Sequence, residues 1–294
     1  MTRLRLRAHA KINLYLKVLG RRSDGFHEIE TVLQSITLHD SLELEMGGEG
    51  LRLEVSDPAL PAGPSNLAWR AAESLAPAMG QGRGLTIRLT KRIPSGAGLG
   101  GGSSDAAATL MGVEALYGLG LPLATLHRQA AAIGSDVPYF LTGGTALLMG
   151  RGTEVHPLPD LPQVELLIVS AGGPLATSDV YAQLQEPLTL ASRTASIPSS
   201  GRMPADLESL VRLGNDLEPN ATRLCPAIGH IREALRAAGA RVAAMTGSGS
   251  AVFGVFADAG TARNAAGILE RKGIRALACA TLDRVLFQGE RFEH

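Results

Sequence analysis

The chain has 294 residues, 45% of them hydrophobic and 19% charged, a composition typical of a soluble globular protein with room for two domains. Its 28 basic and 28 acidic residues give a formal net charge of zero. That balance argues against a nucleic-acid-binding protein, because such surfaces carry an excess of Lys and Arg. No apolar run is long enough to cross a bilayer, and the alternating N-terminus argues against a signal peptide. The two cysteines match no metal or redox spacing, which predicts reduced thiols in a cytoplasmic protein.

The N-terminal region reads mainly as strands. Apolar residues alternate with other residues over positions 3–19, which predicts one long strand or a hairpin. After a turn at Asp24-Gly25, strand character resumes over residues 26–32. Two more strands are predicted at 42–46 and 51–55, and Ser65 or Asn66 is expected to cap a helix that continues to about residue 75.

A glycine-rich run lies between an alternating strand at 85–90 and an Ala-rich helical pattern at about 104–117. Five of the seven residues from 96 to 102 are glycines, which weaken a fold unless the backbone needs a positive φ or a close approach. A strand, a glycine loop and a helix N-terminus capped by Ser or Asp together bind phosphate, because the open backbone N–H groups converge there. We therefore predict a phosphate-binding loop. Its residues are Pro94, Ser95, Gly96, Ala97, Gly98, Leu99, Gly100, Gly101, Gly102, Ser103 and Ser104.

Other phosphate-binding motifs do not fit this run. It matches G-x-G-x-x-G, but the dinucleotide fold also needs a following parallel strand with an acid at its end, and a second helical pattern stands there instead. No Gly-Lys pair occurs for a Walker loop, and the protein-kinase triplets H-R-D and D-F-G are absent. The loop therefore belongs to another kind of nucleotide-binding protein.

The remaining chain alternates helices and strands around two further breaks. A helix at 123–133 precedes Asp136, which lies between a Gly-Ser pair and Pro138, and Pro138 disfavours a helical residue before it. A Gly-Arg-Gly stretch at 150–152 is a plausible domain boundary. Beyond it we predict a strand at 166–169, a short helix capped by Thr177, an aperiodic loop at 189–204, helices beginning near 215 and 226, strands at 243–245 and 251–256 around a Gly-Ser turn, a helix at 262–271 and a strand at 276–282.

Single polar residues in these segments leave more than one interpretation open. Lys11 fits a solvated lysine on a strand, and His27 fits an ordinary surface or core histidine. Asp136 fits a turn or cap residue as well as a catalytic one. The Gly-Ser turn at 246–250 fits either a hairpin loop or the wall of a ligand site.

Taken together, several separated segments resemble the galactokinase, homoserine, mevalonate and phosphomevalonate (GHMP) kinase superfamily. The triple glycine before two serines and the D-G-F-H sequence resemble one branch, the 4-diphosphocytidyl-2-C-methyl-D-erythritol kinases. The matching segments are Ala8–Leu14, Arg21–Ile29, Pro94–Ala107, Gly134–Pro138, Asn215–Glu218 and Thr246–Ser250.

The resemblance implies a two-domain α+β GHMP-kinase fold, with a ferredoxin-like C-terminal domain and the active site in the cleft between the domains. We divide the chain into an ATP-binding domain, 1–150, and a C-terminal domain, 151–294. The implied reaction transfers the ATP γ-phosphoryl group to the 2-hydroxyl of 4-diphosphocytidyl-2-C-methyl-D-erythritol, a step of the non-mevalonate route to isoprenoid precursors. The implied protein is a monomer or a weak homodimer.

The resemblance also implies roles for individual residues. The glycine loop with Ser103 and Ser104 would hold the ATP phosphates with Mg²⁺, and no residue is implied as a metal ligand. Asp136 would take the proton of the hydroxyl, and Lys11 would orient Asp136. The remaining implied residues bind the substrate: Asn13 and His27 read the cytosine edge, Phe26 and Tyr181 sandwich the base, and Thr177, Gly247 and Ser248 line the site.

Two other functions compete with this interpretation. A superfamily kinase acting on homoserine or a mevalonate derivative would need no cytosine pocket, so the D-G-F-H sequence argues against it. A nucleotide-binding regulator or scaffold without activity would be expected to lack Lys11 or Asp136, and both are present.

Overall fold

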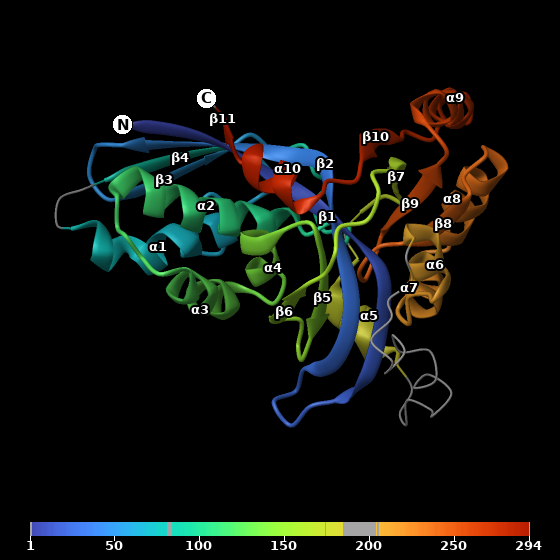
Figure 1. Cartoon of the computed structure of the whole chain (residues 1–294), viewed down its shortest axis with the longest axis horizontal. Coiled ribbons are helices and arrows are strands. Elements are labelled where there is room, and N and C mark those ends of the chain that lie inside the picture. The colour runs from blue at the N-terminus through green and yellow to red at the C-terminus, as the bar shows by residue number, and fades with distance from the viewer. Residues whose placement is uncertain (1, 81–83, 174, 185–203, 205, 294) are drawn as a thin grey trace.

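The computed structural model describes residues 2–80, 84–173, 175–184, 204 and 206–293. Two sheets lie next to each other and are covered by helices (Figure 1). The first sheet has seven strands: five in the order β11-β1-β2-β4-β3, then β5, which also pairs with β2, and β6, which pairs with β5. Its strands are β1 (Arg3–Arg21), β2 (His27–Met46), β3 (Leu51–Val55), β4 (Leu85–Thr90), β5 (Thr145–Met149), β6 (Glu154–Pro157) and β11 (Phe292–Glu293).

The second sheet has four antiparallel strands in the order β10-β7-β9-β8. When these strands are numbered by their order in the chain, their order across the sheet is 4-1-3-2. Helices follow the first and third strands, which is the ferredoxin-like arrangement. The predicted fold class is therefore confirmed. These strands are β7 (Glu165–Ser170), β8 (Val242–Met245), β9 (Ala251–Phe256) and β10 (Leu277–Ala280).

The helices fall into two groups that follow the two sheets (Figure 1). The first group, α1 to α4, packs on the first sheet and on itself. The second group includes α8 and α9, whose apolar faces pack on the ferredoxin-like sheet. The helices are α1 (Leu67–Met79), α2 (Gly101–Tyr117), α3 (Leu123–Ile133), α4 (Val137–Thr142), α5 (Thr177–Ala182), α6 (Leu207–Arg212), α7 (Glu218–Leu224), α8 (Ala227–Ala237), α9 (Ala259–Glu270) and α10 (Arg284–Gly289).

Strand β1 runs through all three apolar cores of the molecule. Its outer end places Leu6 in the core under α2, its middle places Ile12 in the core between the sheets, and its far end places Val18 in the core under α8. The outer end shows the simple alternation of a one-sided strand, but the middle is buried on both faces. Polar side chains in the middle of β1 are therefore buried between the two halves of the molecule.

Several local predictions were correct and others were wrong. Asn66 caps α1, because its Oδ1 accepts a hydrogen bond from the backbone N–H of Ala68. The two strands predicted at 26–32 and 42–46 belong to one strand, β2, whose alternation is interrupted where a register shift against β1 adds residues between Ser35 and His39. The cysteines are free, as predicted.

Two helix starts differ from the predictions. Helix α2 begins at Gly101 after a left-handed Gly100, so neither a serine nor an aspartate caps it. Helix α4 begins at Val137 despite the following proline, because the first turn of a helix tolerates a residue without an N–H group. Leaving the N-terminus of α2 without a side-chain cap keeps its first N–H groups open to a ligand.

The short elements α6, α10 and β11 were not predicted, because segments of two to six residues show no usable period. Thr177 is the first residue of α5, and Ala176 occupies the cap position that was predicted for it. Residues 189–203 of the predicted aperiodic loop lie outside the described part of the chain. The division at residue 150 remains a prediction, and both β6 and β11 extend the first sheet from beyond it. No helix within the described ranges is long and apolar enough to span a membrane.

The glycine loop and the second Gly-Ser turn join the two halves at one tight contact. The backbone N–H of Ala251 donates to the carbonyl of Ala97 at 3.0 Å. Gly98 has a φ of +80°, and a Cβ there would lie only 2.3 Å from the carbonyl oxygen of Thr246. Gly98 is therefore needed both for its backbone conformation and for the approach of the two loops.

We predict that Gly98→Ala destabilises the protein more than Gly118→Ala. Gly118 also has a positive φ, +60°, but no atom lies within 4 Å of its added Cβ. Gly118→Ala should therefore cost only the backbone strain, about 1–2 kcal/mol, whereas Gly98→Ala must also separate two backbones. Urea unfolding of both variants measures the difference, and equal losses of unfolding free energy would contradict the tight contact.

Candidate active site

Lys11 and Asp136 form an ion pair at the centre of the molecule. Lys11 projects from the middle of β1 and is 3% exposed, with its Nζ 3.5 Å from Asp136 Oδ2. Asp136 occupies the cap position of α4, but its side chain makes no capping hydrogen bond and is about a third exposed. The carboxylate is therefore held by a lysine and still open to the solvent-filled cleft, as a proton acceptor needs to be.

Asn13 holds the lysine of this pair in place. Its Oδ1 accepts a hydrogen bond from Lys11 Nζ at 2.7 Å, and its Nδ2 donates to Thr31 Oγ1 at 2.9 Å. His27 lies near the tip of the β1–β2 hairpin, where it pairs with Arg21. The structure does not bring Asn13 and His27 together, because Asn13 pairs with Leu33 in the middle of the two strands and lines the cleft below, whereas His27 lies near the hairpin tip.

A cleft of about 570 Å³, which we call the phosphate-loop cleft, opens above this pair. It contains ten of the eleven predicted loop residues together with Lys11, Asn13 and Asp136. Its further wall comes from α5 and the second Gly-Ser turn, which contribute Thr177, Tyr181, Gly247 and Ser248. An apolar side that the sequence did not reveal comes from residues outside any motif: Leu60, Pro61, Leu67 and Leu89.

The loop backbone has the conformation that a phosphate site requires. Gly96, Gly98 and Gly100 have positive φ angles of 65°, 80° and 74°. The first N–H groups of α2, from Gly101 to Ser103, have no acceptor within the helix. These donors and the positive end of the α2 dipole are directed at the cleft, an arrangement that favours an anion.

The two serines after the glycines differ in their surroundings. Ser103 lines the cleft. Ser104 is 2% exposed, does not line the cleft, and donates its hydroxyl proton to the carbonyl of His9 at 2.7 Å. The structure therefore places Ser103 and not Ser104 at the cleft, because neighbouring positions on a helix point in different directions. That either serine holds phosphate stays a prediction.

A buried charge cluster that sequence reasoning missed lies beside the loop, and two of its residues, Lys91 and Asp105, also line the phosphate-loop cleft. Lys91, just after β4, bonds to the carboxylates of Asp40 and Asp105. Asp40 also accepts hydrogen bonds from the backbone N–H groups of Arg92 and Ile93, which directly precede the loop. Burial raises the pKa of Asp105 to about 7, with Lys91 opposing the shift. Only the position of Lys91 and Asp105 on either side of the loop hinted at this cluster in the sequence.

A second cavity of about 810 Å³, which we call the hairpin pocket, lies beside the cleft. Phe26 and His27 from the β1–β2 hairpin line it together with Tyr181 from α5. The rings of His27 and Tyr181 are 4.8 Å apart, and the Arg151 guanidinium lies 5.2 Å from the Phe26 ring centroid. Phe26 is 49% exposed, which is unusual for a large apolar ring and leaves one side open to a ligand.

The two cavities meet at shared residues. Asp136, Thr177 and Tyr181 line both of them. Thr177 is hydrogen-bonded to Ser248 between their hydroxyls at 2.8 Å. The pKa of Tyr181 is raised by burial and by the nearby charge of Asp136, which keeps its hydroxyl protonated. Most of the predicted site residues therefore lie around one continuous space, with Asp136 at the junction.

Comparisons with known proteins agree on one family. The GHMP kinases N terminal domain matches residues 66–144, and the GHMP kinases C terminal domain matches residues 203–275. A 4-diphosphocytidyl-2-C-methyl-D-erythritol kinase from Moorella thermoacetica is 46% identical over 95% of this chain and 99% of its own. The chain belongs to the 4-diphosphocytidyl-2-C-methyl-D-erythritol kinase family. A relative of the same description from Geobacter sulfurreducens is 40% identical over 96% of this chain and all of its own.

Solved structures place this kinase chain in the same group. A crystal structure of 4-(cytidine 5'-diphospho)-2C-methyl-D-erythritol kinase is 38% identical, with a TM-score of 0.76 over 94% of this chain and 98% of its own. A homoserine kinase from Cytophaga hutchinsonii has a TM-score of 0.75 at 21% identity, covering 96% of this chain and 95% of its own. At that identity the second match shows the shared fold alone.

We predict that the buried charge cluster makes stability depend on pH through Asp105. Its raised pKa means that the folded state binds a proton more tightly than the unfolded state, whose carboxyl keeps a pKa near 3.8. The free energy of unfolding should therefore fall as pH rises through the range from about 4 to about 7. This contribution is absent in Asp105→Asn. Between pH 5 and 8 the free energy of unfolding of the unmutated protein should therefore fall more than that of the variant.

Urea unfolding at several pH values measures this difference, and Asp258→Asn serves as the control. The backbone N–H of Thr261 lowers the pKa of Asp258, so its contribution changes only below the ordinary aspartate range. The control should show the same dependence as the unmutated protein between pH 5 and 8. A parallel pH dependence in Asp105→Asn would show that Asp105 is not the group involved.

Proposed function

We propose that the protein transfers the γ-phosphoryl group of ATP to the 2-hydroxyl of 4-diphosphocytidyl-2-C-methyl-D-erythritol. The observation that supports this reaction most is the junction of the two cavities at Asp136. A substrate with a nucleotide base at one end and an alcohol at the other can place the base between Phe26 and Tyr181 and the alcohol beside the phosphate loop. The family membership supports the same reaction.

Asp136 accepts the proton of the reacting hydroxyl in this proposal. The hydroxyl oxygen forms the new bond to the γ-phosphorus, the bond from that phosphorus to the β–γ bridging oxygen breaks, and ADP leaves. Lys11 lies 3.5 Å from Asp136 and close enough to the loop to offset negative charge on the transferred group. Asn13 keeps the Lys11 ammonium in that position through its 2.7 Å hydrogen bond.

ATP fits the phosphate-loop cleft on chemical grounds. The open N–H groups of α2 and the hydroxyl of Ser103 suit the phosphates, and the apolar side formed by Leu60, Leu67 and Leu89 suits a purine ring. Within the described residues, no three His, Cys, Asp or Glu side chains come together as a metal site. Mg²⁺ would therefore be held mainly by the phosphates, with Ser103 nearby, and when bound it neutralises phosphate charge.

The hairpin pocket supplies the selection for cytosine in this proposal. Phe26 and Tyr181 offer flat apolar faces, and the ring nitrogens of His27 offer one hydrogen-bond donor and one acceptor when the ring is neutral. Cytosine presents an acceptor at N3 and donors at N4, whereas uracil reverses both. A site built on hydrogen bonds rejects an analogue that leaves its polar groups unpaired.

The direct test measures ADP release by the purified protein with each of several acceptors: the cytidine compound, its uridine analogue, homoserine and mevalonate. We expect rapid turnover with the cytidine compound, much slower turnover with the uridine analogue and none with the other two. Turnover of homoserine or mevalonate would support the other superfamily activities. ATP binding without turnover of any acceptor would support a nucleotide-binding regulator.

We predict that Asp136→Asn lowers kcat by roughly 10²–10⁴, the usual contribution of a positioned base. The amide keeps the size of the side chain but cannot take up the proton. The Kd for ATP, measured by calorimetry, should stay within about twofold of the unmutated value, because that contact is made by the loop. Turnover near the unmutated rate would remove Asp136 from the reaction.

We predict that Tyr181→Ala raises KM for the cytidine compound by about tenfold and leaves the KM for ATP nearly unchanged. Base–aromatic stacking contributes roughly 1–3 kcal/mol per base, and each 1.4 kcal/mol is about tenfold in affinity. Tyr181→Phe is the matched control, since it keeps the ring and should keep the KM. If only the KM for ATP changed, Tyr181 would contact ATP and not the cytosine base.

A further inference from the structure

The short helix α4 carries Asp136 at its N-terminal end and is covered at its other end by the last residues of the chain. We call residues 282–293 the C-terminal segment; it contains α10 and β11. Strand β11 pairs with β1, so the segment returns to the first sheet after the whole ferredoxin-like domain (Figure 1). The contacts between this segment and α4 connect residues about 150 positions apart.

Arg291 makes the central contact. Arg291 is 6% exposed, and its Nη2 donates to the carbonyls of Phe140 at 3.1 Å and Leu141 at 3.2 Å. No carboxylate of the described residues lies within ion-pair distance of it. Burial lowers the pKa of Arg291 to about 10, which leaves it charged at neutral pH. A buried cation without a carboxylate partner is costly, and the negative end of a helix is the group it contacts here.

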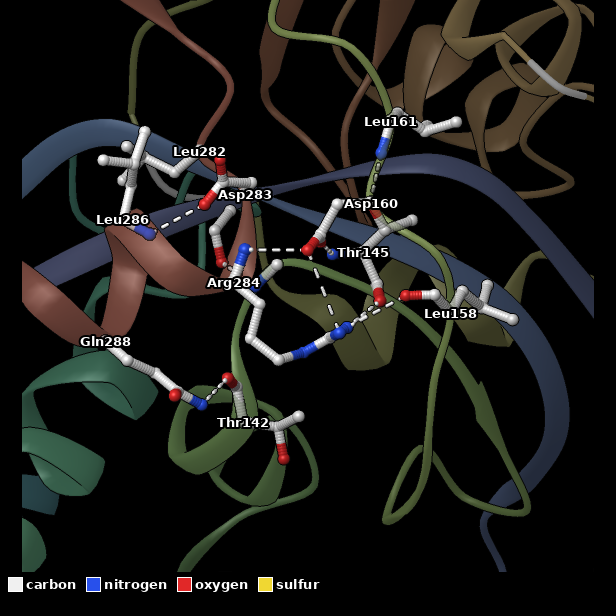
Figure 2. A network of polar contacts seen from close by, with 12 residues as sticks. Thr142, Thr145, Leu158, Asp160, Leu161, Leu282, Asp283, Arg284, Leu286 and Gln288 are labelled. Carbon is white, nitrogen blue, oxygen red and sulfur yellow. Dashed lines mark hydrogen bonds and ion pairs between the residues drawn. The ribbon is translucent and has the colours of Figure 1, made fainter.

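Other residues of the segment cover the same helix end. Gln288 Nε2 donates to the carbonyl of Thr142 at 3.2 Å (Figure 2). The ring of Phe287 lies against Gly143, where an added Cβ would come within 2.0 Å of the ring. Three consecutive carbonyls at the end of α4, those of residues 140 to 142, therefore receive hydrogen bonds from the C-terminal segment.

The other contacts of α4 lead directly to the phosphate-loop cleft. The ring of Phe140 and the side chain of Lys11 both lie against Gly100, since a Cβ there would be 2.8 Å from Phe140 Cζ and 3.1 Å from Lys11 Cγ. The hydroxyl of Tyr139 bonds to Ser35 on β2 at 2.7 Å. A helix of six residues is only roughly 9 Å long. A displacement at its C-terminal end therefore reaches Asp136 at the other end.

We propose that Arg291 is a positioning residue for the phosphoryl transfer step. It holds α4 so that Asp136 stays beside Lys11 and Phe140 stays against the phosphate loop. Arg291 does not line either cavity, so it acts through α4 and not on the reactants. This role rests on the proposed function, in which Asp136 is the proton acceptor.

The test compares Arg291→Met with Arg284→Met. Arg284 belongs to the same segment and also donates to backbone carbonyls, but to those of Thr145 and Leu158, outside α4 (Figure 2). Arg291→Met should lower kcat about 10- to 100-fold, since a displacement of about 1 Å costs on that order. The KM values should change less than threefold, and more ATP should be hydrolysed per product formed. Arg284→Met should keep the kcat of the unmutated protein, and Arg291→Lys should recover part of the loss.

Amide hydrogen exchange provides a second measurement that needs no turnover. Exchange over residues 137–143 should accelerate in Arg291→Met and remain slow in Arg284→Met. If Arg291→Met fails to fold, Gln288→Ala is the milder variant and should shift kcat and exchange in the same direction. Three outcomes would overturn the proposal. The two methionine variants could have equal effects, Arg291→Met could keep the unmutated kcat, or its loss of kcat could match its loss of folded protein. Absence of turnover in the unmutated protein would instead overturn the proposed function. The difference in hydrogen exchange between the two methionine variants would still show whether Arg291 stabilises α4.

Discussion

The buried ammonium of Lys11 is the constraint on which the site depends. A charge that is only 3% exposed needs close acceptors, and it finds them in Asn13 on its own strand and Asp136 at the start of α4. The strand is fixed because its apolar residues enter all three cores, and α4 is fixed by its contacts with β2, the loop and the C-terminal segment. The position of the carboxylate therefore follows from packing that extends over most of the chain.

Two lysines beside the phosphate loop, Lys11 and Lys91, both line the cleft and differ in their surroundings. Lys11 faces the cleft with a partly exposed carboxylate, so its charge is available to a reacting group. Lys91 is bound between two buried carboxylates and fixes the start of the loop through Asp40, which also accepts two backbone N–H groups. The first arrangement suits chemistry on a phosphate, and the second suits holding the loop in one conformation.

The hairpin pocket explains how substrate selection and chemistry can be linked in one molecule. Tyr181 and Thr177 line both cavities, and Ser248 from the second half bonds to Thr177. Residues of the β1–β2 hairpin, of α5 and of the second Gly-Ser turn therefore meet around Asp136. Since these segments come from both halves of the chain, the site is complete only when the two halves pack together.

The sequence by itself determined the local elements with strong patterns and the residues that belong to short motifs. The glycine loop, the helix at 123–133, the fold class and the family follow from residues that are neighbours in the chain. Only the tertiary structure decided which motif residues reach the cleft: Ser103 lines it and Ser104 does not, and Asn13 contacts Lys11 and not His27. It alone revealed the cluster around Lys91 and the hold of Arg291 on α4. These depend on contacts between residues 14 to about 150 positions apart, and such contacts leave no period or spacing in the sequence.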